Sequence, residues 1–457
     1  MHRDVELAKE PIGKLLIKYS VPAIIGMVVN SLYNVVDRMF IGQIPDIGYL
    51  AITGVGITMP VLTIILGLAM LVGIGATSLI SIRLGEGKKE EAEKVLGNAF
   101  VVAIIMAIIL MIVGLMCASS LLGAFGGDAQ TIPYGTKYIN IFLLGTIFNV
   151  SSFVFTSIMR ADGSPRMSAM CMVIGCVINI ILDAVCIFVF NMGIQGAALA
   201  TIISQFITAV IGMYYFTKGK SNLKIHRGNL KLEAAIVKSI FIIGAAPCAM
   251  QLAISLVQVV MNKVLDATGG QIAIGAMTSI SAIIMLVLMP IFGINQGAQP
   301  IIGYNYGAKN YERSKKTSLL SMAFATVILV IGFVIIQLFP ETFVKMFDGS
   351  GSMLEVAAPG LRLYSLTMPI LAVSIMGSNY FQAVGKAKIA TLLSLLRQVV
   401  ILIPVILIMS KLGGLTGVWL AQPVSDIIST IIVGIILIKE FRSYKTIDKE
   451  NIVEEMA

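Results

Sequence analysis

Long apolar runs separated by short polar connections recur along the whole chain. Each run has about 20 residues or more, the length that an α-helix needs to cross a bilayer. The runs fall at 15–41, 50–80, 95–122, 133–159, 167–190, 193–217, 236–265, 271–303, 317–340, 356–383, 389–410 and 414–438. This pattern predicts an all-α integral membrane protein with about 12 transmembrane helices.

The composition supports a membrane protein. Of the 457 residues, 57% are hydrophobic and only 12% are charged, whereas a soluble domain carries about 25% charged residues. The net charge of +9 could indicate a nucleic-acid partner, but its distribution argues against one. The basic residues lie in alternate connections, at 3–18, 83–94, 160–166, 218–238, 309–316, 386–388 and 439–449.

The connections between these basic ones, at 41–50, 119–133 and 266–271, hold no Lys or Arg. Because basic connections stay on the cytoplasmic side, both termini are expected to be cytoplasmic and the number of spans even. We therefore expect a multi-pass protein of the lipid bilayer with no nucleic-acid partner.

The two halves of the chain are copies. Arg160-Ala-Asp-Gly-Ser-Pro-Arg166 aligns with Gln382-Ala-Val-Gly-Lys-Ala-Lys388 at an offset of 222, and Gly75-Ala76 aligns with Gly297-Ala298 at the same offset. We divide the chain into a six-helix lobe (1–217), a cytoplasmic linker (218–235), a second six-helix lobe (236–440) and a cytoplasmic tail (441–457). Six spans per copy make the repeats parallel, related by a pseudo-twofold axis along the membrane normal, with a substrate cleft between them.

Two acidic residues interrupt apolar spans of the first half. They occur in Asn30-x3-Asn34-x2-Asp37 and Asn179-x3-Asp183, where spacings of four and seven place the polar side chains on one helix face. An ionised Asp inside a membrane span is costly and usually handles an ion or a proton. A structural hydrogen-bond role is the alternative, and for Asp37 a salt bridge with Arg38.

The second copy does not keep these acids. Asp37 aligns with Asn262, Asn179 with Ile401, Asp183 with Val405 and Thr201 with Gln422. Both acids fall in the outer halves of their spans, so they could meet there. Two such carboxylates must then hold a proton or share a cation, and the oxygens of Thr201 and Asn179 suit either Na+ or H+. Pro22 permits a bend in the same span as Asp37.

Other polar and soft residues have more than one interpretation. Arg397 and Asp426 form either a structural ion pair or part of a substrate or coupling site. The methionines are mainly core filler, although a cleft-facing subset would bind bulky apolar substrates. The candidate lining of the substrate cleft comprises Tyr33, Gln251, Gln258, Asn262, Met27 and Met285.

No motif of catalysis is visible. The chain has neither a Walker-type loop nor a serine nucleophile elbow, and its five cysteines and two histidines form no metal-binding pattern. We therefore expect neither enzymatic activity nor a cofactor, other than H+ or Na+ as a coupling ion.

The combination of motifs resembles the multidrug and toxic compound extrusion (MATE) transporters, especially their bacterial MepA-like type, over essentially the whole chain. The resemblance rests on Pro22 with Asn30 and Asp37, Arg160-Ala-x-Gly163, Asn179-Ile-Ile-Leu-Asp183 and Gly193-x2-Gly196-Ala-Ala-x-Ala-Thr201. It implies two six-helix bundles around a V-shaped cleft. It also implies export of organic cations or amphipathic drugs against H+ or Na+.

The resemblance further implies a cation site in the first lobe. This site carries onto Asp37, Asn179, Asp183 and Thr201, which would be the metal ligands if Na+ is the coupling ion. Asn30, Tyr138 and Thr156 fall where relatives place further polar members, the last at a position where relatives often have Asn or Glu. Asn34 is added to these candidates because it shares the helix face of Asn30 and Asp37. The acids that bind Na+ in the second lobe of some relatives are missing here.

Two other functions share parts of this pattern. A lipid-linked precursor flippase or polysaccharide exporter would have the same architecture, but its cleft would be lined by several basic residues, and these spans hold few. A passive channel would not need paired acids. Internal duplication removes the need for a dimer, so we expect a monomer.

Overall fold

The computed structural model describes residues 7, 9–44, 51, 54–124, 131–345 and 351–456. It leaves out the side chains at 34, 35, 38, 42, 124, 271, 351–353 and 445–456. The described residues form helices and connections and contain no strand.

The first half of the chain forms one lobe. Its helices are α2 (Ile12–Gly42), α4 (Met59–Gly85), α5 (Lys89–Ala124), α6 (Ile132–Leu144), α7 (Thr146–Ala161), α8 (Pro165–Ala184), which continues into the π-helical η1 (Val185–Val189), and α9 (Ile194–Thr217). A connection with the 3-10 turn η2 (Arg227–Leu230) leads into the second half.

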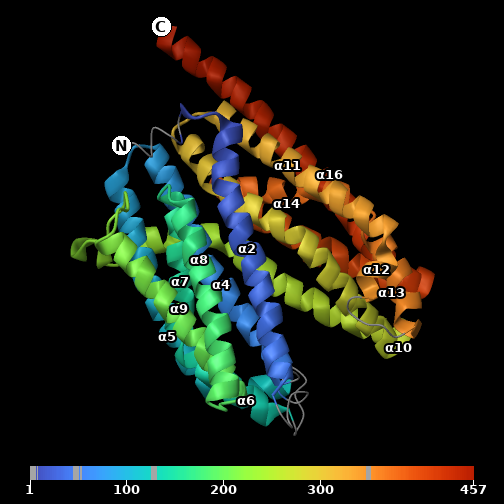
Figure 1. The fold of residues 1–457 in the computed structure, drawn as a ribbon. Coiled ribbons are helices and arrows are strands. Elements are labelled where there is room, and N and C mark those ends of the chain that lie inside the picture. The colour runs from blue at the N-terminus through green and yellow to red at the C-terminus, as the bar shows by residue number, and fades with distance from the viewer. Residues whose placement is uncertain are drawn as a thin grey trace.

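The second half forms the other lobe. Its helices are α10 (Ala234–Gly307), α11 (Tyr311–Leu338), α12 (Pro340–Lys345), α13 (Gly351–Tyr364), α14 (Met368–Ala383), α15 (Ala387–Leu395) with the π-helical η3 (Leu396–Leu402), and α16 (Ile403–Met456). In Figure 1 the blue and green helices of the first lobe lie on one side and the yellow to red helices of the second lobe on the other.

Two glycines divide the longest helices into separate spans. Gly270 within α10 has φ 63° and ψ −159°, and Gly414 within α16 has φ 55° and ψ −135°, values that glycine alone adopts without strain. Nine helices in the described part of the chain are long and apolar enough to cross a membrane, and two bent pairs add two spans. Because Gly414 divides the last of the nine, the expected 12 spans are confirmed.

The fourth and tenth spans are bent, which the sequence pattern did not reveal. The α6–α7 pair bends by 56° at Gly145, and the α13–α14 pair bends by 57° between Tyr364 and Met368. The two bends occupy corresponding places in the two copies.

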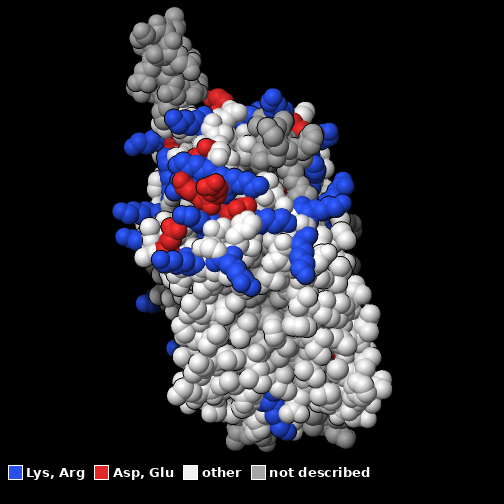
Figure 2. All heavy atoms as spheres, turned by 90° about the vertical axis from the view of Figure 1, so that its left-hand side faces the viewer, with Lys and Arg blue, Asp and Glu red and all other residues white. Residues whose placement is uncertain are grey.

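Charged side chains gather at one end of the molecule, the end where α2 begins and α4 finishes (Figures 1 and 2). Most of the remaining visible surface in Figure 2 is uncharged, as a bilayer requires. We call this end the charged end and the other the apolar end. Large apolar side chains face outward between them, such as Ile109 and Ile435, which are 55% and 62% exposed.

The lobes meet through glycines toward the charged end. A Cβ at Gly244 of α10 would lie 1.8 Å from the Leu71 carbonyl oxygen of α4, and one at Gly85 would lie 2.0 Å from the Tyr304 carbonyl oxygen. Such helices approach backbone to backbone, which glycine permits in membranes. The Gln299 amide also donates to Ser78 Oγ across this contact, at 2.8 Å.

The segment that leads into each lobe is held by the opposite lobe. Before α2, the carbonyl oxygens of Leu7 and Glu10 accept hydrogen bonds from the Arg313 guanidinium of α11, at 3.2 and 2.8 Å. Before α10, the Glu233 backbone N–H donates to Asn98 Oδ1 of α5 at 2.8 Å. These crossed contacts close the charged end between the lobes.

Candidate functional site

The two acids of the first lobe meet in its interior. Asp37 comes from the last turns of α2 and Asp183 from the last turn of α8, and they are 8% and 0% exposed. Their carboxyl groups interact electrostatically and lie within hydrogen-bonding reach of each other, once one of them holds a proton. The spans that carry them are far apart in sequence, so only the fold creates this pair.

Neutral polar side chains complete the cluster. Asn179, one turn before Asp183, donates through Nδ2 to Thr201 Oγ1 at 3.3 Å, and Thr201 Oγ1 donates to the Ala197 carbonyl at 3.1 Å. The Tyr138 hydroxyl hydrogen-bonds with Thr201 and lies within the electrostatic range of both acids. We call Asp37, Tyr138, Asn179, Asp183 and Thr201 the acid cluster.

Several acceptor oxygens of the acid cluster have no donor among the described residues. Among the described residues, both carboxyl oxygens of Asp183 and Oδ1 of Asn179 are buried with no hydrogen-bond donor. Buried acceptors in folded proteins normally have a partner, and a buried carboxylate without one is especially costly. A proton on the acid pair, or one small cation held by these oxygens, would satisfy them.

The acid cluster would offer oxygen ligands to a bound ion. The described residues contain no group of three or more His, Cys, Asp or Glu side chains that could hold a metal ion. The cluster instead offers two carboxyls, an amide oxygen and hydroxyls, which are hard oxygen ligands.

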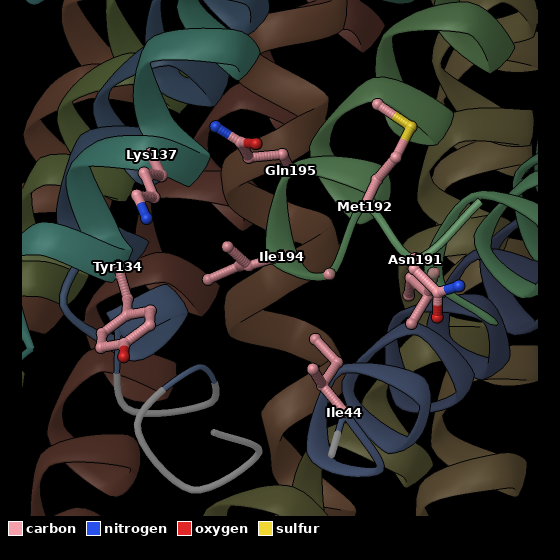
Figure 3. A pocket seen from close by; sticks show the side chains of 9 residues that line it. Ile44, Tyr134, Lys137, Asn191, Met192, Ile194 and Gln195 are labelled. Atoms are coloured by element: carbon pink, nitrogen blue, oxygen red, sulfur yellow. The ribbon is translucent and has the colours of Figure 1, made fainter. Parts of the chain in front are cut away.

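A pocket of about 330 Å³ opens at the apolar end of the same lobe. In Figure 3, Tyr134 and Lys137 of α6 lie on one side, Asn191 and Met192 on the other, and Ile194 between them. Ile44, Ile187, Gly193 and Gln195 complete the lining.

This pocket lies next to the acid cluster along several helices at once. Tyr134 precedes Tyr138 by one turn, Ile187 follows Asp183 by one turn, and Ile194 precedes Thr201 by two turns, so roughly 6–10 Å of helix separates the pocket from the cluster. Sequence reasoning missed this pocket. In the sequence, Asn191-Met-Gly193 was the signal available for this pocket. Asn and Gly readily adopt positive φ in a tight connection, and φ is 51° at Asn191 and 56° at Gly193.

Two further polar residues of α2, Asn30 and Tyr33, precede Asp37 on the same helix. Asn30 and Tyr33 are half-buried, two turns and one turn before Asp37. Tyr33, predicted in the substrate cleft, lies within the electrostatic range of Tyr138, so it reaches the edge of the acid cluster. The side chains of Asn34 and Arg38 lie outside the described residues, and their roles stay predictions.

Thr156 lies elsewhere in the lobe. Its hydroxyl donates to the Ser152 carbonyl of its own helix at 2.8 Å, and its carbonyl accepts from Ser168 Oγ at 2.7 Å. Arg160 also donates to Ser168, at 2.9 Å. Because Asn179 follows Ser168 on α8 by 11 residues, roughly 16 Å of helix separates Thr156 from the acid cluster.

The predicted cleft residues fall into two groups. Gln251 and Met27 are half-buried where the lobes meet: Gln251 Cβ faces Gly67 of α4, and Met27 Sδ accepts from Gln296 Nε2 at 3.8 Å. Gln258 and Asn262 are exposed, and their spacings of seven and eleven from Gln251 place them on the same face of α10. Met285 is 45% exposed. Helix α10 therefore contacts the first lobe at Gln251 and exposes polar side chains farther toward the apolar end.

Arg397 and Asp426 lie close together in the second lobe. Asp426 is 3% exposed, and its charge and that of Arg397 interact. However, its oxygens accept hydrogen bonds from Gln422 Nε2 at 3.0 Å and Thr367 Oγ1 at 3.2 Å. Neutral donors, rather than the guanidinium, therefore hold this carboxylate.

Comparison with known proteins agrees with this architecture. The MatE family model matches residues 22–185 and 247–408, once in each lobe. The multidrug export protein MepA of Staphylococcus aureus (strain MRSA252) is 26% identical over 446 residues, 98% of each chain. MepA of Staphylococcus saprophyticus is 23% identical over 448 residues, also 98% of each chain.

Solved structures share the fold over nearly the full length. An outward-facing multidrug resistance MATE family transporter of the MOP superfamily superimposes with a TM-score of 0.91 at 26% identity, covering 97% of this chain and 98% of that one. A MATE in the bent conformation gives the same TM-score at 25% identity, with the same coverage. The chain therefore belongs to the MATE family of multi-pass membrane transporters, which are not enzymes.

Proposed function

We propose that this protein exports organic cations and amphipathic drugs by antiport, with the acid cluster of the first lobe as the site of the coupling ion. The observation that carries the proposal is the buried pair Asp37 and Asp183, together with acceptor oxygens that lack donors. The export function of the MepA relatives supports the transported class.

The proposed orientation places the charged end in the cytoplasm of a prokaryotic cell, as the positive-inside rule favours. Both termini then lie inside, and the apolar end faces outward. The glycine contacts and the crossed segments lie toward the charged end, while Gln258 and Asn262 are exposed toward the apolar end. This arrangement supports an outward-facing resting state.

Coupling requires that the ion and the drug bind different states with different affinity. In the proposed cycle, the coupling ion reaches the acid cluster from the pocket lined by Tyr134 and Lys137. It lowers the negative charge of the acid pair and so reduces the cost of enclosing that pair. The transporter then releases drug outward and turns inward.

Helix α2 is suited to transmit ion binding at the acid cluster to the contact between the two lobes. It holds Asp37 near one end, and around Pro22 it packs on α10 of the second lobe. A Cβ at Gly293 would lie 2.6 Å from the Ile24 side chain, and one at Gly297 would lie 2.6 Å from Ser20 Oγ. A bend at Pro22 would therefore alter this contact.

Reconstituted transport tests the proposal. Purified protein in liposomes, as a single chain without a cofactor, would be given rhodamine 6G under separately imposed Na+ and pH gradients. We expect one gradient to drive uptake or release in the wild type and not in Asp183→Asn. Asp266→Asn, at an exposed acid near the end of a span, is the control and should behave as wild type. Gradient-driven transport of wild-type strength in Asp183→Asn would refute the proposal.

A further inference from the structure

The second lobe contains its own buried polar cluster at the bend between α13 and α14. The Tyr364 hydroxyl donates to Gln422 Oε1 at 3.1 Å, and Gln422 and Thr367 both donate to Asp426. Thr367 lies at the bend itself, while Gln422 and Asp426 lie one turn apart on α16. Both oxygens of the Asp426 carboxylate therefore have neutral donors.

Arg397 is the cation beside this cluster. It lies in the π-helical η3, and π-helical turns are frequent at functional sites. Its carbonyl accepts from Ser425 Oγ at 3.3 Å, which holds η3 against α16. Across the part of the chain that the structure describes, its guanidinium makes no hydrogen bond and no ion pair within 4.0 Å, although its charge acts on Asp426 and Tyr364.

The depth of Arg397 decides which surface it faces. It follows the start of its span, Ala387, by ten residues, or roughly 15 Å of helix. The lipid side of this span is occupied by Leu392, Val400 and Leu407, which are 60%, 58% and 45% exposed. A guanidinium at this depth avoids lipid and faces a water-filled cavity or a partner. Because Arg397 is half-buried, part of it is accessible, and for the same reason that part is expected on the cleft side of the span.

We propose that Arg397 forms a binding site for the carboxylate group of amphipathic substrates. A guanidinium is a planar fork that pairs with a carboxylate through two hydrogen bonds. Asp426 balances the charge of Arg397 in the empty site, but its oxygens are occupied by Gln422 and Thr367. The donors of the guanidinium thus stay available to a ligand.

The site extends the substrate class of the proposed export function, on which it rests. A purely cationic drug gains no partner from Arg397, whose charge Asp426 balances, while a zwitterionic one gains a partner for its acid group. The second lobe would then select among amphiphiles by their negative group, and the first lobe would supply the ion coupling.

A matched pair of probes tests this proposal. Rhodamine 6G and rhodamine 19 share one xanthene cation, but the first is an ethyl ester and the second carries the free carboxylate. Binding of each to purified protein and its gradient-driven transport would be measured in the wild type and in Arg397→Gln. We expect Arg397→Gln to weaken rhodamine 19 binding and transport by about tenfold or more, the size of a lost charged hydrogen bond. Rhodamine 6G should change by less than about twofold.

Two further variants keep the test decisive. Arg397→Lys retains the charge but loses the fork, so rhodamine 19 should bind with an affinity between those of the wild type and Arg397→Gln. Asp426→Asn preserves the shape and removes the competing carboxylate, so it should tighten rhodamine 19 binding and not that of rhodamine 6G. This result would support the site even if Arg397→Gln failed to fold.

Other outcomes would overturn the site. An equal loss of both probes in Arg397→Gln would assign Arg397 a structural role, and unchanged rhodamine 19 binding in folded Arg397→Gln or Asp426→Asn would exclude carboxylate recognition. Failure of the proposed function is distinct, because it would appear as gradient-independent rhodamine 6G transport in the wild type.

Discussion

The two lobes place different chemistry in corresponding interiors. The first lobe buries two acids, Asp37 and Asp183, among neutral polar groups. In the second lobe, Asp183 is replaced by Val405 and Asn179 by Ile401, which is 8% exposed. Its charges are instead the opposite pair Arg397 and Asp426. Both lobes nevertheless keep the bent span, and each has a π-helical segment in the next span, although at different positions along it.

This difference separates a site whose charge has to change from one whose charge is already balanced. Two buried carboxylates cannot both stay ionised at low cost, so the first lobe needs a proton or a cation. A guanidinium beside a carboxylate is neutral as a pair and needs no ion. The duplicated helices are a common scaffold, and the polar residues on them give each lobe its role.

The largest expected effect comes from removing an acid of the first lobe. Asp183→Asn should reduce gradient-driven export roughly 5–150-fold, the range of a coupling free energy between two sites. Drug binding without a gradient should change far less. Transport assays in liposomes with and without the gradient measure both quantities. Equal losses in the two would mean that the residue holds the structure and does not couple the ion.

Moving the acid to the second lobe tests whether the lobes are interchangeable. In Asp183→Asn/Val405→Asp the acid stands at the corresponding position, but Asn262 replaces its partner Asp37 there. We expect transport to stay as low as in Asp183→Asn, again roughly 5–150-fold below wild type. Recovery of gradient-driven transport would show that the lobes do not differ in the way described. The level of folded protein from size-exclusion chromatography is the control.

A smaller effect is expected from the neutral side of the acid cluster. Thr201→Val removes the hydroxyl that accepts from Asn179 and leaves a buried amide without that partner, which should cost about 1–3 kcal/mol of stability. Thr201→Ser keeps the hydroxyl and should stay near wild type. Thermal unfolding of the purified protein in detergent measures the two variants. Equal melting temperatures of Thr201→Val and wild type would contradict the described hydrogen bond.

The smallest effect is expected at Thr156. Its hydroxyl bonds only to carbonyls of its own helix, Ser152 and Phe153, among the described contacts. Thr156→Ala should therefore cost at most about 1.5 kcal/mol of stability and leave the dependence of export on the gradient unchanged. A loss of coupling comparable to that of Asp183→Asn would show that Thr156 belongs to the ion site, as the family resemblance implied.

Particular residues show how far sequence reasoning reached for the site. Asp37, Asn179, Asp183 and Thr201 could be selected because polar residues inside apolar spans are costly and stand out. Thr156 shared that signal, but its position along α7 places it beside Ser168. Thr367 could not be selected as a partner of Asp426, because it comes from another span and reaches the carboxylate only through the bend before α14.

The sequence alone determined that the chain crosses a membrane about 12 times, that alternate connections carry the basic residues, and that the two copies run parallel. Span length, loop charge and repeat offset follow from the order of residues along the chain. The tertiary structure alone decided that Asp37 meets Asp183, that Arg397 is left with open donors, and that the lobes close toward the charged end. Those features depend on how helices from distant segments rotate and bend against one another, and this is set by packing between spans.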